Sequence, residues 1–249
     1  MQEQLAAGGH RGIKAKTLPT AAELVSLSQE LLDAARNHDR NPAALGILKA
    51  LNPDHLEAVL TTDAARKAFW INVYNALNLH WMPTQGDWGL NQRIRHFFQR
   101  KLELGGGRLS LNDIEHRILR RSRIWWARGW SRHPFPKRWE KQLRVDQLDP
   151  RIHFALNCGA NSCPAIRHYS LEGVEAELEM ATVAFLQNET EVEEGKVMLS
   201  SLFRMYLGDF GGRAKLLIWL EKYLPEVQVD SKIRYRPYDW TPNLNKWAE

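Results

Sequence analysis

The sequence has almost no cysteine and no long apolar run. Its 249 residues include two cysteines, Cys158 and Cys163, too few for the disulfide framework of a small secreted domain. No segment approaches 18 consecutive apolar residues, and the N-terminus has neither the apolar core nor the cleavage pattern of a secretory signal. We therefore expect no transmembrane segment and a cytoplasmic location, or export if a targeting segment is missing from this chain.

Several motifs that identify enzymes and nucleic-acid-binding domains are also missing. There is no phosphate-binding loop, no GxGxxG, no GxSxG, and no helix-turn-helix, zinc-finger or RNP pattern. The C-x4-C spacing of the cysteines differs from the usual C-x2-C half of a zinc site. These absences predict no cofactor, no metal and no sequence-specific nucleic-acid recognition. A metal site made of His116, His153 and the two cysteines is the weaker alternative.

The sequence does contain enough apolar residues, 44% of the chain, to bury a core without a metal or disulfide. Capping residues and apolar spacing predict helices from Thr20, after Pro53, from Thr62 to Pro83, from Ser110, over 171–188 and over 213–223. Strands are expected over 151–157 and 196–199, with an extended tail over 233–240. This pattern predicts a helix-rich α+β fold with a few short antiparallel strands, as a single globular domain at 20–249 after a flexible segment at 1–19.

The segment RIHFALNCGANSCPAIR, residues 151–167, holds both cysteines. A strand that ends at Asn157 and turns at Gly159 would place the Cys158 thiol at the end of an element, where a pocket can form. If Pro164 begins a helix, Cys163 is its N-cap, where free N–H groups lower the pKa of a thiol. Either cysteine could therefore be a nucleophile, and either could equally be a buried structural thiol.

A thiol nucleophile needs a base and a group that orients the base. His116 and His153 are the candidates. In a strand, His153 would point to one face and Cys158 to the other, so the pattern favours His116, with Glu115, Asp113 or an asparagine as its orienting group. Each histidine could also be a half-buried side chain that only makes structural hydrogen bonds.

Three asparagines, Asn72, Asn75 and Asn78, follow one another in steps of three along the predicted helix that ends at Pro83. The helix is apolar on nearly all sides, so we expect it to be buried and central. Buried amides must find partners, because each unpaired one costs roughly 1–3 kcal/mol. The asparagines therefore either pin loops to this helix or orient a catalytic histidine and bind substrate.

A basic, aromatic insertion occupies residues 122–148. Residues 93–144 around it contain fifteen Lys and Arg against four Asp and Glu, which predicts an anionic partner. Interleaved Arg and Trp can stack on bases and pair with phosphates, but without a recognition motif nucleic acid is not the expected partner. A lid-like or solvated insertion is the simpler interpretation.

Five segments occur in order along the chain: FWINVYNALNLH, LSLNDIEHRILR, DPRIHFALNCGANSCPAIRHY, LSSLFRMYLGDFGG and YDWTPN. Together they resemble the family called domain of unknown function 547, over residues 61–243. Members of that family occur alone in bacteria and joined to other modules in plants and animals. The resemblance implies little about activity. The polar positions that match its motifs are Asn72, Asn75, Glu115, His116, His153, Asn157, Cys158, Ser162, Cys163 and Arg167.

The resemblance also helps to choose between the cysteines. Plant members keep the first cysteine and vary the second, which favours Cys158 as the reactive thiol. Many bacterial members carry an export signal, and this sequence departs from them. Its insertion at 122–148 is longer than in compact members, so inferences from the insertion apply to this subgroup.

The resulting hypothesis is a cysteine-dependent hydrolase or acyl transferase that acts on an amide, peptide or ester, with a small molecule or peptide as substrate. Cys158 would be the nucleophile, His116 the base, and Glu115 or Asn75 the orienting group, with backbone N–H groups of the turn 159–162 stabilising the oxyanion. A circularly permuted papain-like arrangement would fit this hypothesis by analogy. The binding residues would be Asn72, Asn78, His153, Asn157, Ser162, Cys163 and Arg167. The alternative is a non-catalytic binding or scaffold domain with a buried Asn/His/Cys network.

Overall fold

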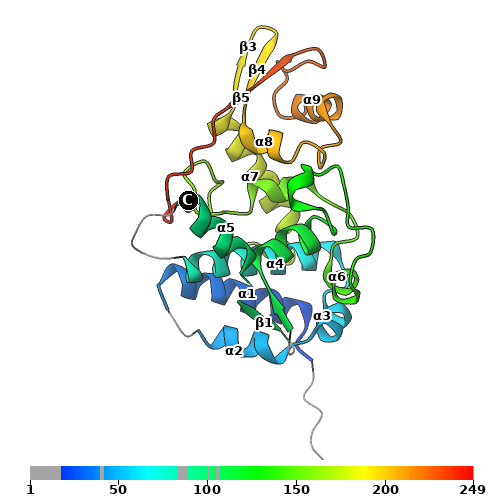
Figure 1. The fold of residues 1–249 in the computed structure, drawn as a ribbon, viewed down its shortest axis with the longest axis vertical. Coiled ribbons are helices and arrows are strands. Elements are labelled where there is room, and N and C mark those ends of the chain that lie inside the picture. Colours follow the sequence, from blue (N-terminus) through cyan, green and yellow to red (C-terminus); the bar gives the residue numbers. More distant parts are fainter. Residues whose placement is uncertain (1–17, 40–41, 83–88, 100, 105–106, 249) are drawn as a thin grey trace, which may run out of the picture.

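The computed structural model describes residues 18–39, 42–82, 89–99, 101–104 and 107–248. In the lower part of the molecule in Figure 1, helix α1 (Ala21–Arg36) packs along helix α4 (Asp63–Trp81). Both begin where the sequence predicted, at Thr20 and Thr62, whose side chains accept hydrogen bonds from N–H groups of the first turn. Helix α4 is buried on nearly all sides, which confirms the predicted central helix. The predicted end at Pro83 lies outside the described residues.

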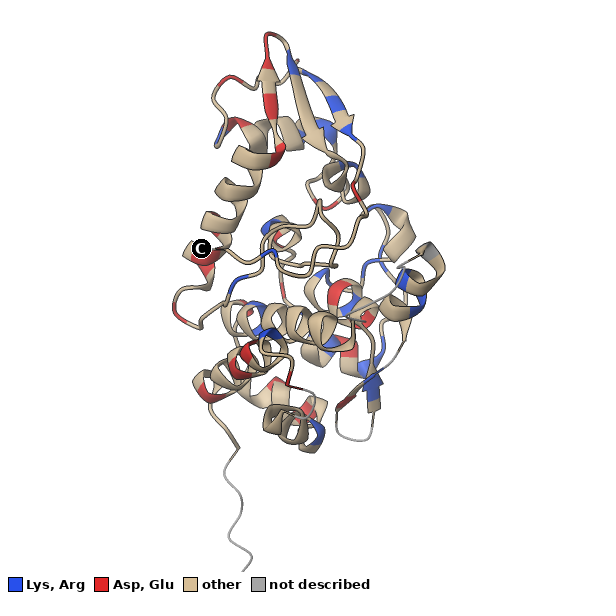
Figure 2. Ribbon diagram, turned by 90° about the vertical axis from the view of Figure 1, so that its left-hand side faces the viewer, with Lys and Arg blue, Asp and Glu red and all other residues tan. Residues whose placement is uncertain are grey.

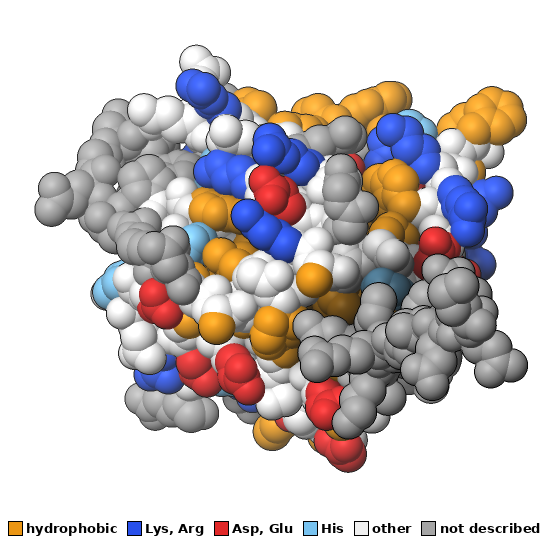
Figure 3. Space-filling view, turned by 90° about the horizontal axis from the view of Figure 1, so that it is seen from below, with side chains coloured by type: hydrophobic (Ala, Val, Ile, Leu, Met, Phe, Trp, Pro, Cys, Tyr) orange, Lys and Arg blue, Asp and Glu red, His pale blue; other side chains and the backbone are white. Residues whose placement is uncertain are grey.

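Shorter elements surround this pair. Helix α2 (Ala43–Ala50), which the sequence did not predict, contacts strand β1 (Leu102–Leu104), and α3 (Pro53–Val59) contacts α6 (Arg138–Leu143). Strand β1 pairs antiparallel with β2 (Gly107–Leu109). Seen from this end, hydrophobic side chains lie in small separate areas, with basic side chains toward one edge and acidic ones toward the opposite edge (Figure 3).

The upper part in Figure 1 consists of helices and a three-stranded sheet: α7 (Val174–Glu189), β3 (Glu191–Glu193), β4 (Lys196–Ser200), α8 (Ser201–Met205), α9 (Arg213–Glu221) and β5 (Lys232–Arg236). Its aromatic core includes Phe154, Phe203 and Trp219. Strand β3 carries glutamates, and β5 at the other edge of the sheet carries Lys and Arg (Figure 2).

The α+β fold is confirmed, but one strand pair differs from the prediction. Strands β3 and β4 are antiparallel, whereas β4 and β5 are parallel. Between β4 and β5 the chain passes through α8 and α9. A crossover of that length lets a strand return in the same direction, which a tight hairpin cannot do.

The predicted strand over 151–157 is wrong. Residues Pro150–Phe154 form a short 3-10 helix, η3, which begins at Asp149, whose carboxylate accepts the N–H of Arg151. A proline in the first turn fixes the φ angle that a helix needs, and the capping carboxylate satisfies a free N–H group. These two local signals outweigh the β-prone alternation of the sequence, and in the structure residues 152–157 are all buried.

The predicted helix after Pro164 is also wrong. The chain stays extended there, and Ile166 pairs with the C-terminal segment through a bridge to Trp247. The N–H of Ile166 donates to the carbonyl of Lys246 over 2.7 Å. Cys163 is therefore not a helix N-cap, and the reason given for a lowered thiol pKa at that position does not apply.

The helix predicted from Ser110 is present, with an unexpected geometry. Ser110 and Asp113 cap each other, as the side chain of Ser110 accepts the N–H of Asp113 and the carboxylate accepts the N–H of Ser110. From Asp113 to Leu119 the chain then forms a π-helix, η1, which is buried over most of its surface. π-Helical turns are rare and frequently lie at functional sites.

Helix α5 (Leu90–Phe98) and the insertion at 122–148 pack beside the central helix and η1. Helix α5 is linked to α4 by a hydrogen bond between His96 and Asn78. The insertion at 122–148 begins with a short 3-10 helix, η2 (Trp125–Ala127), and ends in α6. Among the described residues no helix is long and apolar enough to span a membrane. Of the predicted flexible segment at 1–19, residues 1–17 lie outside the described part of the chain.

Candidate functional site

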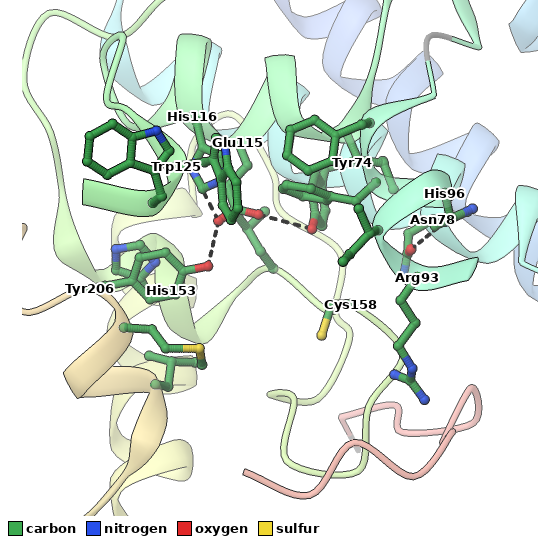
Figure 4. A pocket seen from close by; sticks show the side chains of 18 of the residues that line it. Tyr74, Asn78, Arg93, His96, Glu115, His116, Trp125, His153, Cys158 and Tyr206 are labelled. Carbon is green, nitrogen blue, oxygen red and sulfur yellow. Dashed lines mark hydrogen bonds and ion pairs between the residues drawn. The ribbon is translucent and has the colours of Figure 1, made fainter. Parts of the chain in front are cut away.

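A cavity of about 380 Å³ lies between α4, α5, η1, η2, α8 and the C-terminal segment (Figure 4). Four of the residues singled out in the sequence as chemically active line it together: Glu115, His116, His153 and Cys158. Asn78 lines it as well. These residues come from α4, η1, η3 and the loop after η3, so the fold brings together groups that are up to 80 positions apart.

Cys158 is half-buried at the cavity wall, whereas Cys163 is buried with 1% of its surface exposed. The two thiols lie against one hydroxyl group, since the Tyr238 oxygen is 3.7 Å from Cys158 Sγ and 3.3 Å from Cys163 Sγ. The backbone N–H of Cys158 also donates to Cys163 Sγ over 3.0 Å. Cys158 is thus the thiol that a ligand in the cavity can reach.

The surroundings of the two thiols shift their pKa values in opposite directions. Interaction with Cys163, together with burial, raises the pKa of Cys158. Burial also acts to raise the pKa of Cys163, but hydrogen bonds from Cys158, from the Tyr238 hydroxyl and from backbone N–H groups outweigh it and lower that pKa to about 7. The negative charge of the pair therefore rests on Cys163, and Cys158 keeps its proton.

Glu115 lies at the buried end of the cavity with both carboxylate oxygens occupied. Tyr206 donates its hydroxyl to Oε1 over 2.7 Å, and Tyr74 donates to Oε2 over 3.1 Å. Burial acts to raise the pKa of Glu115, but interactions with His116, with the Arg120 guanidinium and with the Tyr206 hydroxyl hold it below the ordinary value. Glu115 is therefore an ionised, fixed charge.

His116 accepts a hydrogen bond at Nδ1 from the guanidinium of Arg120, over 2.6 Å. An arginine can only donate, so the proton of the imidazole must be on Nε2. Burial lowers the pKa of His116 to about 3, so this ring is neutral and its one acceptor nitrogen is already used. Glu115 Oε1 is 3.6 Å from His116 Nδ1, but Nδ1 is unprotonated, so the two atoms are both acceptors and Glu115 does not orient this ring by a hydrogen bond to Nδ1.

His153 is held in the other tautomer by Asp209. Its Nε2 is 2.8 Å from Asp209 Oδ2, which also accepts from Arg120 Nε over 2.6 Å. A carboxylate can only accept, so Nε2 carries the proton and Nδ1 has the free lone pair. The ring stacks on Tyr206 with centroids 3.8 Å apart. Burial lowers the pKa of His153, and Asp209 acts against that shift.

Asp209 is a functional candidate that the sequence reasoning missed. Its side chain is fully buried, and His153 and Arg120 hold its pKa well below the usual range although burial opposes this. The only sequence signal was its place in YLGDFGG, between glycines. Those glycines allow a close approach: a Cβ on Gly208 would lie 2.5 Å from the carbonyl carbon of Gly129. The insertion is thereby packed directly against the segment that carries Asp209.

The three asparagines of α4 pair with backbone groups. Asn72 donates to the Tyr169 carbonyl over 2.8 Å and accepts its N–H over 2.9 Å. Asn75 donates to the Ala155 carbonyl and accepts the N–H of Asn157, both over 2.9 Å. Asn78 donates to the Asn157 carbonyl over 2.7 Å. These contacts favour the loop-pinning role for Asn72 and Asn75, and within the described chain Asn75 forms no hydrogen bond with His116.

The remaining predicted residues build the turn around the cysteines. Asn157 accepts the N–H of Gly159 and donates to the Pro164 carbonyl, each over 2.7 Å. Ser162 accepts the N–H of Asp239 over 2.8 Å. Arg167 does not line the cavity, and its buried Nε has no hydrogen-bond partner among the described residues.

The turn at 159–162 does not form the expected oxyanion site. The N–H groups of Gly159, Asn161 and Ser162 donate to Asn157, Thr241 and Asp239, so three of its four donors are used within the protein. In the described part of the chain, no three His, Cys, Asp or Glu side chains are grouped as a metal site would require.

A family model described as "Protein of unknown function, DUF547" matches residues 59–186. This stretch includes Glu115, His116, His153 and Cys158, whereas Asp209 and Tyr238 lie beyond it. No curated protein and no solved structure matches the chain.

Proposed function

Because this chain belongs to the DUF547 family of proteins of unknown function, we propose its activity from the cavity alone: a cysteine-dependent hydrolase or acyl transferase acting on an amide, peptide or ester. One observation carries the proposal. The accessible thiol of Cys158 lines the same cavity as a neutral imidazole, His153, that is oriented by a buried carboxylate, Asp209. Nucleophile, base and orienting group are the parts that covalent acyl transfer needs.

The tautomers decide which histidine acts as the base. His116 has no free acceptor nitrogen, because Arg120 occupies Nδ1, so it is suited to donate from Nε2 to a developing oxyanion. His153 is bonded through Nε2, and no hydrogen bond joins its Nδ1 to another described residue, so Nδ1 is suited to take a proton. The proposal therefore replaces His116 with His153 as the base and keeps Cys158 as the nucleophile.

The first half of the reaction forms an acyl-enzyme. His153 takes the thiol proton of Cys158, and the sulfur adds to the carbonyl carbon of the substrate, forming a C–S bond. The oxyanion receives a hydrogen bond from His116 Nε2. The tetrahedral intermediate then breaks its C–N or C–O bond, and the leaving group takes the proton from His153.

The second half releases the acyl group. Water, or an acceptor alcohol or amine in a transferase, loses a proton to His153 and adds to the thioester carbon. The C–S bond breaks, and the sulfur of Cys158 regains a proton from His153. The ionised Glu115 stays unprotonated throughout and fixes the hydroxyl groups of Tyr74 and Tyr206 beside the reacting groups.

The proposal is tested by trapping the acyl-enzyme. The full chain is incubated with a panel of p-nitrophenyl esters, quenched in acid, and searched by mass spectrometry for an acyl adduct on Cys158. We expect an adduct and ester turnover in the wild type, no turnover in Cys158→Ser, and a loss of about 100-fold or more in kcat for His153→Gln. His168→Gln, a histidine outside the cavity, is the matched control and should keep wild-type turnover.

Either of two results would overturn the proposal. One is a wild type that never forms an adduct on Cys158 with any p-nitrophenyl ester in the panel. The other is turnover that persists at the wild-type rate in Cys158→Ser. Circular dichroism of each variant separates a lost reaction from a lost fold.

One observation favours a second candidate, a binding domain without catalysis. Among the described residues, Cys158 Sγ has no hydrogen bond to an imidazole, and its polar partner is the Tyr238 hydroxyl at 3.7 Å. A closed network of buried polar groups can simply fix the shape of a ligand cavity. On this alternative, binding of an anionic partner at the insertion 122–148 would weaken steeply with salt and would be unchanged in Cys158→Ala.

A further inference from the structure

Large exposed apolar side chains are concentrated at the mouth of the cavity. Trp126 is 66% exposed, Trp125 53%, Ile94 48% and Trp240 47%, and all four line the cavity. Most exposed apolar residues on a soluble protein lie singly, and a group of them around one opening indicates a binding site for an apolar ligand.

These side chains form two walls. On one side, α5 and η2 meet where the ring of Phe98 lies edge-on to Trp125, with centroids 5.4 Å apart. On the other side, the C-terminal segment places Tyr238 and Trp240 with ring centroids 4.6 Å apart. Cys158 lies against the second wall, with Sγ 3.7 Å from the Tyr238 hydroxyl, and Figure 4 shows it apart from Trp125 of the first wall. A flat or extended apolar group can therefore lie between the walls and reach the thiol.

The cavity has a negative charge at its buried end and a positive charge at its mouth. Glu115, the only carboxylate among the described lining residues, lies at the buried end, where Tyr74 and Tyr206 occupy its oxygens. The other charged lining residues are Arg93 and Arg128. Arg128 is exposed, so it stands at the mouth. A ligand that enters past these guanidinium groups is favoured if its outer end is anionic.

The arginine at position 128 is also held in place by the fold. Its backbone adopts a left-handed conformation with φ of 49°, and its carbonyl accepts the N–H of Gly208 over 2.8 Å. This contact fastens the insertion to the segment that carries Asp209. The backbone that carries the guanidinium is therefore bonded to the segment that contributes Asp209 to the buried network.

We propose that the cavity takes an amphiphilic acyl compound: an ester, thioester or amide with an apolar chain or ring system and an anionic phosphate or carboxylate group at its outer end. The apolar part lies between the two aromatic walls, the carbonyl group faces Cys158, and the anionic group pairs with Arg128. A cavity of about 380 Å³ suits a small molecule of this kind. This inference rests on the proposed function for the position of the carbonyl group, but the ligand class follows from the walls and the arginines.

The ligand class is tested by binding, without any turnover. Octyl phosphate, 1-octanol and inorganic phosphate are each titrated by calorimetry into the Cys158→Ser chain. We expect octyl phosphate to bind, 1-octanol to bind at least threefold more weakly, and inorganic phosphate alone to give no measurable binding. Arg128→Gln should weaken octyl phosphate about threefold to fivefold, the range of an exposed ion pair, and leave 1-octanol unchanged. Trp126→Ala should weaken both octyl compounds.

The matched control is Arg138→Gln, an arginine of the same insertion that does not line the cavity. The ligand class is overturned if octyl phosphate and 1-octanol bind equally, or if Arg138→Gln weakens octyl phosphate as much as Arg128→Gln does. Vesicles of phosphatidylglycerol identify the source of the anion. If Arg128→Gln weakens vesicle binding too, the anion is a lipid headgroup, and if it weakens octyl phosphate alone, the ligand is a soluble compound.

The two proposals can fail separately. Binding is measured on a chain that lacks the Cys158 thiol, so absent ester turnover leaves the binding result intact. Conversely, an acyl adduct on Cys158 without selective binding of octyl phosphate would reject the ligand class and keep the enzyme.

Discussion

At the scale of single residues, Cys158 and Cys163 differ because of what each sulfur accepts. Cys163 Sγ receives the N–H of Cys158 and lies closer to the Tyr238 hydroxyl, so it carries the negative charge more easily. Cys158 is the accessible thiol and keeps its proton. In this arrangement Cys163 influences the Cys158 thiol without itself lining the cavity.

We predict that Cys163→Ala makes Cys158 more reactive. Removing Cys163 takes away the interaction that contributes most to the raised pKa of Cys158, so that pKa should fall. Because the thiolate fraction at pH 8 rises as that pKa falls, alkylation at pH 8 should be several times faster than in the wild type. The measurement is the rate of iodoacetamide alkylation of Cys158 from pH 6 to 10, followed by mass spectrometry.

Tyr238→Phe is the paired variant with the opposite expectation. The Tyr238 hydroxyl lowers the pKa of Cys158, so its removal should slow alkylation at pH 8. An unchanged or slower rate in Cys163→Ala would contradict the prediction, and equal rates in the two variants would show that the thiols do not interact.

At the scale of elements, α4 determines the position of the loop that carries the thiols. Its asparagines bond to the backbone at Ala155, Asn157 and Tyr169 in the manner of a neighbouring strand. A side-chain amide offers one donor and one acceptor with the spacing of a peptide group, so it can hold an irregular segment that has no strand partner.

We predict that Asn72→Ala lowers the free energy of unfolding by about 3 kcal/mol. Asn72 is fully buried, and its loss leaves both the N–H and the carbonyl of Tyr169 without this partner, each at a cost of roughly 1–3 kcal/mol. Urea denaturation followed by tryptophan fluorescence measures the change. Asn188→Ala on the exposed side of α7 removes an amide that bonds only within its own helix and should change stability by less than about 0.5 kcal/mol. If both variants lose a similar amount of unfolding free energy, Asn72 does not stabilise the fold through its hydrogen bonds to Tyr169.

Local sequence signals predicted some of the secondary-structure elements and missed others. The helices from Thr20, Thr62 and Ser110 were predictable because a capping side chain and apolar spacing agree in each case. The segment after Asp149 was not, because its β-prone sequence competes with a proline and a capping carboxylate at its start, and Asn75 of α4 holds its backbone at Ala155 and Asn157. The π-helical geometry of η1 has no sequence signal of its own, since its spacing of apolar residues is that of an ordinary helix.

For the candidate site, too, some features could be predicted from the sequence and others could not. Cys158, Glu115, His116 and His153 were recognisable by residue type and motif, and the structure places all four on one cavity. Their roles were not recognisable, because a tautomer depends on partners that are distant in sequence. Asp209 lies 56 residues from His153 and Arg120 lies 89 residues from Asp209, and only the fold reveals those contacts.

At the scale of the whole molecule, three neutral histidines lie at the cavity, each on a different element. His96 on α5 is bonded to Asn78, His116 on η1 to Arg120, and His153 on η3 to Asp209. Burial lowers the pKa of all three, to about 4 for His96 and about 3 for His116. In the unfolded chain each would titrate near 6.5.

We predict that the free energy of unfolding falls as the pH drops from 7.5 to 5. A histidine whose pKa is lower in the folded state stabilises the fold above the unfolded pKa, and this contribution is lost as the pH falls from about 6.5 toward the folded pKa. At pH 5 the loss is roughly 2 kcal/mol for each of His96 and His116, because the pH is then about 1.5 units below the unfolded value. The carboxylates with lowered pKa values add to acid sensitivity only below about pH 4.5, so this window reports on histidines.

Urea denaturation at pH 7.5, 6.0 and 5.0 measures the slope. In His96→Gln the glutamine amide can still bond to Asn78. The unfolding free energy of this variant should depend less steeply on pH, because about one proton fewer is taken up on unfolding. Asn188→Ala, which removes no titratable group, should leave the slope as it is. If stability is the same at pH 7.5 and 5.0, the buried imidazoles must be able to become protonated in the folded state. The assignment of His153 as a neutral base in a closed network would then be lost together with the pH dependence.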